Sequence, residues 1–261
     1  MADAGGVYYE IHGAADAPPL ILSSGLGGSA TYWQRNLPAL SAHFRVIIYD
    51  HRGTGRSDRA LPEQVTVADL ADDMVVLLDH LGIARASIIG HAAGGVAGLS
   101  LRLSHPDRVA RLVVVNGWAR ADAHFLRCFE ARLTLLHHAG VEAFMKAQPI
   151  FLFPSNWISA HDAALTAELP HQIAAFPGEA TMAKRIAALA AFDATGRLAG
   201  LAERTLVLVA DDDMLVPSQA GERLADELGG APIARMRWGG HACNVTDPAT
   251  FDSLVLDYLR S

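Results

Sequence analysis

The chain has 261 residues, 51% of them hydrophobic, and is long enough for one domain with a full core. Its formal net charge of −7 and its lack of basic runs argue against a nucleic-acid or anionic-membrane partner. No apolar run approaches the roughly 18 residues of a membrane span and the N-terminus lacks a signal-peptide pattern, so we expect a cytoplasmic protein. Cys128 and Cys243 are too few for a disulfide framework and lack metal-ligand spacing, so we expect no metal and no cofactor.

Short apolar runs alternate with longer helical patterns, which is typical of a mainly parallel sheet with crossover helices. The first run, residues 7–11, is expected to be an antiparallel strand at the edge of the sheet. Further along, Thr66 and Asp69 resemble a capping box, and the apolar residues after them follow one helix face up to Leu81. The expected buried strands are residues 20–22, 46–49, 87–89, 112–115, 206–209 and 233–238.

Glycine-rich loops follow the first two buried strands. In the loop of residues 23–28, the backbone N–H of Leu26 is placed to form one half of an oxyanion hole. Ser24 in the same loop is a candidate ligand contact, beside the simpler interpretation that it is a turn hydroxyl. The loop of residues 50–57, Asp-His-Arg-Gly-Thr-Gly-Arg-Ser, is expected to be structural, with Arg52 paired to a carboxylate.

Residues 88–95 have the pattern of a nucleophile elbow, Gly-x-Ser-x-Gly, with Ala92 in place of the serine. The elbow is a sharp turn from a strand into a helix, and Gly90 and Gly94 are expected where the two segments pass too closely for side chains. Strained backbone of this kind costs about 1–3 kcal/mol, and Ala92 bears the strain without contributing a hydroxyl. The N–H of Ala93 is expected to supply the other half of the oxyanion hole.

From residue 117 to residue 200 the short apolar runs that predict strands no longer recur, and the pattern is helical. We therefore expect a core of residues 1–116 and 201–261 with a helical cap of residues 117–200. Such a cap would cover the carboxyl ends of the strands, where open α/β sheets bind ligands. Its aromatic residues, Trp118 among them, would either narrow that pocket and contact substrate or form the core of the cap itself.

An acidic run and a histidine follow the last two expected strands, in the chain order of the partners of an elbow nucleophile. Asp213 is the candidate acid, because the run continues as Asp-x-x-Val-Pro. Folds that carry a nucleophile elbow usually place their acid in this arrangement. Asp211 and Asp212 are expected to form turns or to cap a helix. His241 follows two glycines at a strand end, and the matching acid and elbow favour a catalytic role for it.

These motifs resemble the α/β-hydrolase superfamily over the whole chain, and more narrowly the RutD family of the bacterial Rut pathway, which uses pyrimidines as a nitrogen source. The narrower resemblance rests on residues 90–92, 115–118, 147–149 and 239–248. It implies an α/β-hydrolase fold with a mainly parallel eight-stranded sheet and a helical cap, and alanine at the elbow as a property of the family. It also implies a hydrolase that acts on a C–N bond of a small labile intermediate of uracil breakdown, carbamate or aminoacrylate.

Without a serine, we expect His241, oriented by Asp213, to activate a water that fills the volume of the missing hydroxyl. An oxyanion hole and binding alone leave about 10³–10⁴-fold acceleration, which suffices for a compound that decomposes unaided. Cys243 is the rival nucleophile, although apolar-flanked cysteines are usually buried and inert. Two other classes stay open, namely a catalytically silent metabolite-binding protein and a serine esterase inactivated at the elbow. The sequence decides neither between the two substrates nor between a monomer and a homodimer.

Overall fold

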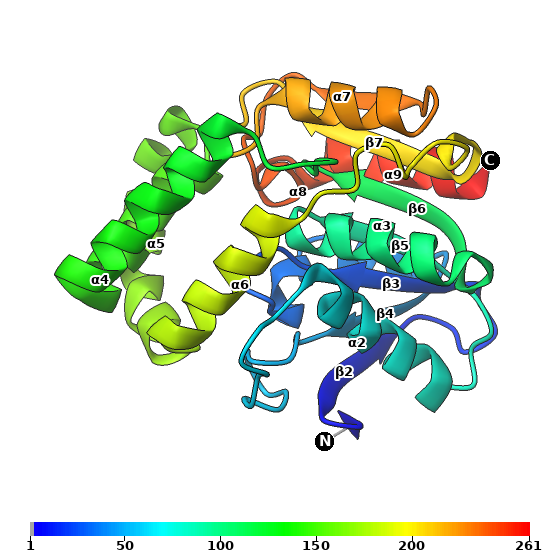
Figure 1. Cartoon of the computed structure of the whole chain (residues 1–261), viewed down its shortest axis with the longest axis horizontal. Helices are drawn as coiled ribbons and strands as arrows, with labels where there is room; N and C mark the ends of the chain where they lie inside the picture. Colours follow the sequence, from blue (N-terminus) through cyan, green and yellow to red (C-terminus); the bar gives the residue numbers. More distant parts are fainter. Residues whose placement is uncertain (1–2) are drawn as a thin grey trace.

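The computed structural model describes residues 3–261, in which eight strands form one sheet (Figure 1). The strand order is β1-β2-β4-β3-β5-β6-β7-β8; β1 and β2 run antiparallel to their neighbours, and the remaining pairs are parallel. This confirms the predicted α/β class with a mainly parallel eight-stranded sheet. The strands are β1 Asp3–Ala4, β2 Val7–His12, β3 Pro19–Ser23, β4 Arg45–Tyr49, β5 Ala86–His91, β6 Val109–Val115, β7 Thr205–Ala210 and β8 Ile233–Met236.

The predicted edge strand is not at the edge, because β1 pairs outside β2. Gly5 and Gly6 connect these two strands with φ angles of 57° and 89°. Two successive residues with positive φ form the tight hairpin turn whose twist matches that of the strands, and glycine adopts this conformation without steric strain. A two-residue strand has too short an apolar pattern to be recognised, which explains the error. The last strand also ends at Met236, two residues earlier than predicted.

Helices cover both faces of the sheet, so alternate residues of each parallel strand are buried on opposite sides. Ile88 of β5 belongs to the core beneath α2, α3 and α7, whereas its neighbour Ile89 belongs to the core beneath α1 and α9. Thr66 and Asp69 form the predicted capping box at the start of α2. The helices of these two layers are α1 Leu37–Ser41, α2 Val67–His80, α3 Ala93–Ser104, α7 Ser218–Glu227 and α9 Pro248–Arg260.

Three long helices are inserted between β6 and β7 and project from one end of the sheet (Figure 1). They are α4 Ala123–Leu152, α5 Ser155–Ala174 and α6 Glu179–Ala191, and we call them the cap. Gly140 interrupts α4 with a φ of 82°, so that this helix consists of two arms. None of the helices in the described part of the chain is long and apolar enough to cross a membrane. The domain boundaries at residues 116/117 and 200/201 stay a prediction.

Candidate active site

Ala92 occupies the sharp turn between β5 and α3, with φ 46° and ψ −106°. A side chain on Gly90 would collide with the backbone of Gly94, and one on Gly94 would collide with the backbone of Ser23. Both glycines are therefore required by the close approach of strand and helix, as predicted. The N–H of Ala92 donates to the carbonyl oxygen of Val115 at 2.8 Å, which ties the turn to the adjacent strand β6. The elbow thus keeps the backbone of a nucleophile site around a methyl group.

His241 and Asp213 form a buried pair at the carboxyl ends of β8 and β7. The Nδ1 atom of His241 lies 2.7 Å from Oδ2 of Asp213, and the two residues are 2% and 7% exposed. The other carboxylate oxygen of Asp213 accepts from the N–H groups of Leu215 and Val216 at 2.7 and 2.8 Å. Because these bonds fix the carboxylate, the imidazole is held by Nδ1, and its Nε2 is the ring nitrogen left for a ligand.

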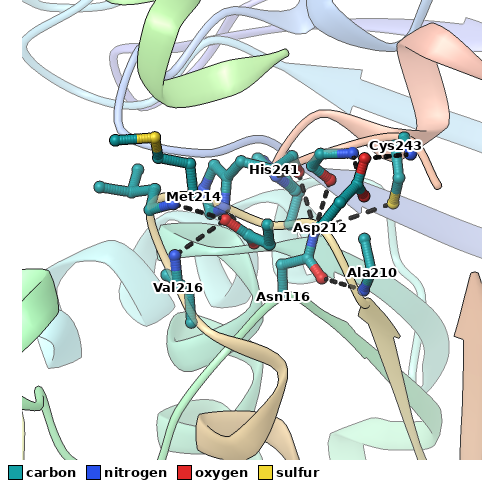
Figure 2. Close-up of polar contacts among 12 residues, drawn as sticks. Asn116, Ala210, Asp212, Met214, Val216, His241 and Cys243 are labelled. Carbon is teal, nitrogen blue, oxygen red and sulfur yellow. Dashed lines mark hydrogen bonds and ion pairs between the residues drawn. The ribbon is translucent and has the colours of Figure 1, made fainter. Parts of the chain in front are cut away.

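The backbone of His241 is fixed by two further side chains whose roles the sequence analysis missed. Its carbonyl oxygen accepts from Nδ2 of Asn116 and from Nε2 of His91, each at 2.8 Å. Oδ1 of Asn116 accepts from the N–H of Ala210 at 3.0 Å, so Asn116 connects the end of β7 to the histidine loop (Figure 2). Burial lowers the pKa of His91 well below its ordinary value, so His91 is a neutral donor at this position.

Asp211 and Asp212 lie in the turn after β7, which confirms one of the two predicted roles, but neither caps a helix. Asp212 accepts from the N–H of Gly240 at 2.8 Å and thereby holds the loop that carries the histidine (Figure 2). Asp211 pairs with Arg235 on the protein surface. Only the helix-cap alternative was wrong, because the carboxylates contact residues 24 and 28 positions away in the chain. The structural interpretation of residues 50–57 is confirmed by an ion pair between Arg52 and Asp73, at 2.8 Å.

A cavity of about 470 Å³ lies between the elbow and the cap. Leu26, Ala92, Ala93 and His241 all line it, together with residues from α4, α5 and α6. Within residues 3–261 the N–H groups of Leu26 and Ala93 have no hydrogen-bond partner. Unpaired donors at the first turn of a helix favour an anionic or carbonyl oxygen. The arrangement therefore combines two free N–H groups, one imidazole and a methyl group on one cavity wall.

The two predicted ligand contacts, Ser24 and Trp118, also line this cavity. They are 1% and 2% exposed, and neither Oγ of Ser24 nor Nε1 of Trp118 has a hydrogen-bond partner among the described residues. The indole packs against Phe125, with ring centroids 4.4 Å apart. Buried donors without partners are uncommon in native proteins and fit groups that a ligand or a water satisfies. Substrate contact by either side chain stays a prediction.

The structure gives no support to a cysteine nucleophile. Cys243 is fully buried in the core on the α9 side of the sheet and does not line the cavity. Burial raises the pKa of its thiol well above the ordinary value, which disfavours the reactive thiolate. Across residues 3–261 there is also no group of three or more His, Cys, Asp or Glu side chains that could hold a metal ion.

Arg185 of α6 connects the cap to the loop that carries Leu26. Its Nε donates to the carbonyl oxygen of Leu26 at 3.1 Å, and one Nη donates to Nδ1 of His51 at 2.9 Å. Burial lowers the pKa of His51 well below its ordinary value, so the ring is neutral and can accept this bond. The sequence gave no sign of Arg185, because the contact joins residues 159 positions apart. Arg185 thus connects the cap by a hydrogen bond to the loop that carries one half of the predicted oxyanion hole.

Comparisons with known proteins agree on the family. Residues 18–139 match the family described as alpha/beta hydrolase fold. The chain is 51% identical over 257 residues to a Caulobacter vibrioides protein named "Putative carbamate hydrolase RutD", covering 98% of this chain and 96% of that protein. A Variovorax paradoxus protein of the same name is 49% identical, with 97% and 96% covered.

Solved structures give the same fold. A hydrolase from Pseudomonas aeruginosa PA01 superposes with a TM-score of 0.86 at 29% identity, covering 98% of this chain and 94% of the other. The enol-lactonase from Burkholderia xenovorans LB400 superposes with a TM-score of 0.83 at 27% identity, covering 98% and 96%. Both superpositions cover 98% of this chain.

Proposed function

The chain belongs to the RutD family of α/β hydrolases, and from this premise we propose that it hydrolyses a C–N bond of carbamate or aminoacrylate in uracil breakdown. Relatives of about 50% identity over nearly the whole chain are named for carbamate hydrolysis and support a hydrolase role in the Rut pathway. The observation that carries the proposal is the buried His241–Asp213 pair beside an elbow with no nucleophile. We further propose that the protein acts in the cytoplasm, without a cofactor, and that its partner is a small molecule.

In the proposed mechanism a water takes the position that a serine hydroxyl would occupy next to Ala92. Nε2 of His241 accepts a proton from this water as it attacks the substrate carbon. Asp213 holds the imidazole through Nδ1 and stabilises the imidazolium that forms, as the acid does in a hydrolase triad. The imidazolium then returns the proton to the departing nitrogen. No covalent intermediate forms, because Ala92 has no atom that can be acylated.

The reaction balances for either substrate. Carbamate and water give bicarbonate and ammonia, whereas aminoacrylate and water give the corresponding oxo acid and ammonia. In both reactions one C–O bond forms from water and one C–N bond breaks, and the proton taken by His241 leaves with ammonia. For aminoacrylate this exchange gives the enol of the oxo acid, whose hydroxyl proton then moves to the neighbouring carbon, so that the C=C bond is lost and a C=O and a C–H bond form. Negative charge that develops on the substrate oxygen is stabilised by the N–H groups of Leu26 and Ala93. For carbamate this oxygen belongs to the carboxylate itself.

A modest acceleration is sufficient for such substrates. Binding and an oxyanion hole can supply about 10³–10⁴-fold, or roughly 4–5.5 kcal/mol of barrier lowering. A peptide or stable amide would need far more. The absence of a hydroxyl at the elbow is therefore compatible with catalysis only when the substrate is intrinsically labile, and this restricts the proposed substrates to compounds that already decompose in water.

The test is the rate of ammonia release from carbamate and from freshly generated aminoacrylate, measured against an enzyme-free control. We expect His241→Ala to abolish the acceleration, because His241 is the proposed base and the imidazole that Asp213 holds through Nδ1. An exposed histidine on the cap, His138, provides a matched control, and His138→Ala should retain full activity. Acceleration by native protein that persists in His241→Ala would contradict the mechanism. Binding without any acceleration would identify a silent metabolite-binding protein instead.

A further inference from the structure

A second polar group faces the cavity from the cap. Arg132 of the first arm of α4 lines the cavity and is only 3% exposed. One Nη of its guanidinium donates to Oε1 of Gln148, on the second arm of the same helix, at 3.2 Å. Its Nε, although buried, has no hydrogen-bond partner among the described residues. The residue thus lines the ligand space and keeps one buried donor without a partner.

The charge of Arg132 has no counter-charge. Within residues 3–261 no Asp or Glu forms an ion pair with it, and its hydrogen-bond partner Gln148 is neutral. Burial lowers its pKa to about 10, which leaves the guanidinium protonated at neutral pH. The nearby Cys128 offers no compensation, since burial raises the pKa of its thiol. Buried charges in proteins are normally paired, so this guanidinium lacks a partner of the opposite charge.

The surroundings favour a planar anion. The guanidinium carbon of Arg132 lies 5.1 Å from the ring centroid of Phe144, 5.4 Å from that of Phe129 and 5.5 Å from that of Phe151. The three aromatic rings are cation–π partners of the guanidinium and make its surroundings apolar. In such a setting a charge-assisted pair of hydrogen bonds to a carboxylate is stronger than in water, and arginine presents its donors in the matching fork.

A purely structural role accounts for only part of this arrangement. The bond from Arg132 to Gln148 does connect the two arms of α4 across the break at Gly140. A neutral side chain could make that connection without the desolvation of a charge. The orientation toward the cavity, the unused Nε and the missing counter-charge are all explained when the partner is a ligand.

We propose that Arg132 is the substrate-carboxylate binding residue of this cavity and that Gln148 positions it. The proposal rests on the proposed function in that both candidate substrates are carboxylate-like acids. It assigns to the cap one contact with the substrate carboxylate. In aminoacrylate this carboxylate is separate from the attacked carbon, whereas in carbamate it is the attacked group, and its oxygens are shared between Arg132 and the N–H groups of Leu26 and Ala93. A neutral compound of the same shape is rejected, because it leaves the buried guanidinium uncompensated.

The first test is calorimetric binding of straight-chain carboxylates from acetate to hexanoate, each paired with its primary amide, in low-chloride buffer. We expect at least one acid to bind native protein about 10- to 100-fold more tightly than its amide, as one buried charge-assisted bond would give. Arg132→Gln should abolish this preference. Arg127→Gln removes an exposed charge from the same arm of α4 and should retain it. Equal binding of acids and amides by native protein, or an undiminished preference in Arg132→Gln, would overturn the proposal.

Gln148→Glu provides a second variant that does not depend on the stability of Arg132→Gln. It places a carboxylate at the atom that already accepts from Arg132, so the protein supplies its own counter-charge. We expect acid binding to weaken at least tenfold while the melting temperature stays equal or rises. Unchanged acid affinity in a folded Gln148→Glu protein would refute a carboxylate site.

Ammonia release, measured on the same proteins, separates this proposal from the proposed function. Acid preference that depends on Arg132 without any hydrolysis would support the carboxylate site and refute the enzyme. Hydrolysis that depends on His241, without any preference for acids over amides, would support the enzyme and refute the carboxylate site.

Discussion

Replacing Ala92 with serine should convert the site into a serine esterase. Both residues carry a Cβ, so the backbone strain at φ 46° is unchanged by the substitution. The added oxygen enters a cavity of about 470 Å³ next to His241, so it creates no overpacking. We therefore expect the free energy of unfolding to change by less than about 1 kcal/mol.

The gain in esterase activity can be bounded from the geometry. In a serine protease, loss of the nucleophile or its histidine costs about 10⁶ in turnover. A serine introduced beside a buried and oriented His241–Asp213 pair should recover part of this factor, about 10²–10⁴, or roughly 2.7–5.4 kcal/mol. The same hydroxyl displaces the proposed water, so hydrolysis of the native C–N substrate should fall at least tenfold.

The assay is hydrolysis of p-nitrophenyl acetate, followed for a burst and for an acyl adduct by mass spectrometry. The double variant Ala92→Ser with His241→Ala is the matched control, since it has the hydroxyl without its base, and it should give neither. A folded Ala92→Ser protein with no adduct, no esterase activity and an unchanged native rate would refute the reasoning. In that case the methyl group of Ala92 does not face the imidazole.

Three further outcomes follow from the structure. Native protein should form no adduct with a serine-directed phosphonate or with iodoacetamide at Cys243, as checked by mass spectrometry, because that thiol is fully buried with a raised pKa. Asn116→Ala should lower the free energy of unfolding by about 2–4 kcal/mol in urea melts and reduce turnover, because it leaves a buried N–H of β7 unpaired and frees the backbone of His241. Burial raises the pKa of Asp252 from 3.8 to about 6, so its contribution to stability is full below about pH 3.8 and is lost as the pH rises from there through 6. Asp252→Asn retains an oxygen acceptor for Asn36 but has no carboxyl group to ionise. The free energy of unfolding of this variant should therefore fall less between pH 4 and pH 8 than that of native protein, by up to about 3 kcal/mol. Parallel pH profiles of the two free energies of unfolding would contradict this.

The parts of the molecule that sequence predicted well are those with local patterns. The elbow is recognisable because Gly90 and Gly94 are required by a close approach within a few residues of chain. Asp213 and His241 follow from the order of strand ends in this fold, and the structure brings them within 2.7 Å. The start of α2 is equally local, because the capping box lies within four residues.

The features that sequence missed depend on contacts between distant segments. Arg132 looks like any helix arginine until Gly140 bends α4 and sets it against Gln148 and three aromatic rings. No sequence pattern indicated that Arg185 would contact the Leu26 loop. Asn116 lay in a stretch that marks the RutD resemblance, but its bonds run to a strand end and a loop more than 90 positions away. No periodicity or spacing records such partners, so only the folded chain identifies them.

The bond between Arg185 and the carbonyl oxygen of Leu26 has a consequence for ligand entry. Helix α6 lines the cavity together with α4 and α5, so an outward shift of α6 would widen the cavity. Such a shift breaks the contact of Arg185 with the Leu26 loop, and the N–H of Leu26 loses its support at the same moment. Opening the cavity in this way and releasing the loop that carries the N–H of Leu26 are thus one mechanical event, so the two N–H groups are in place only while the cap is closed.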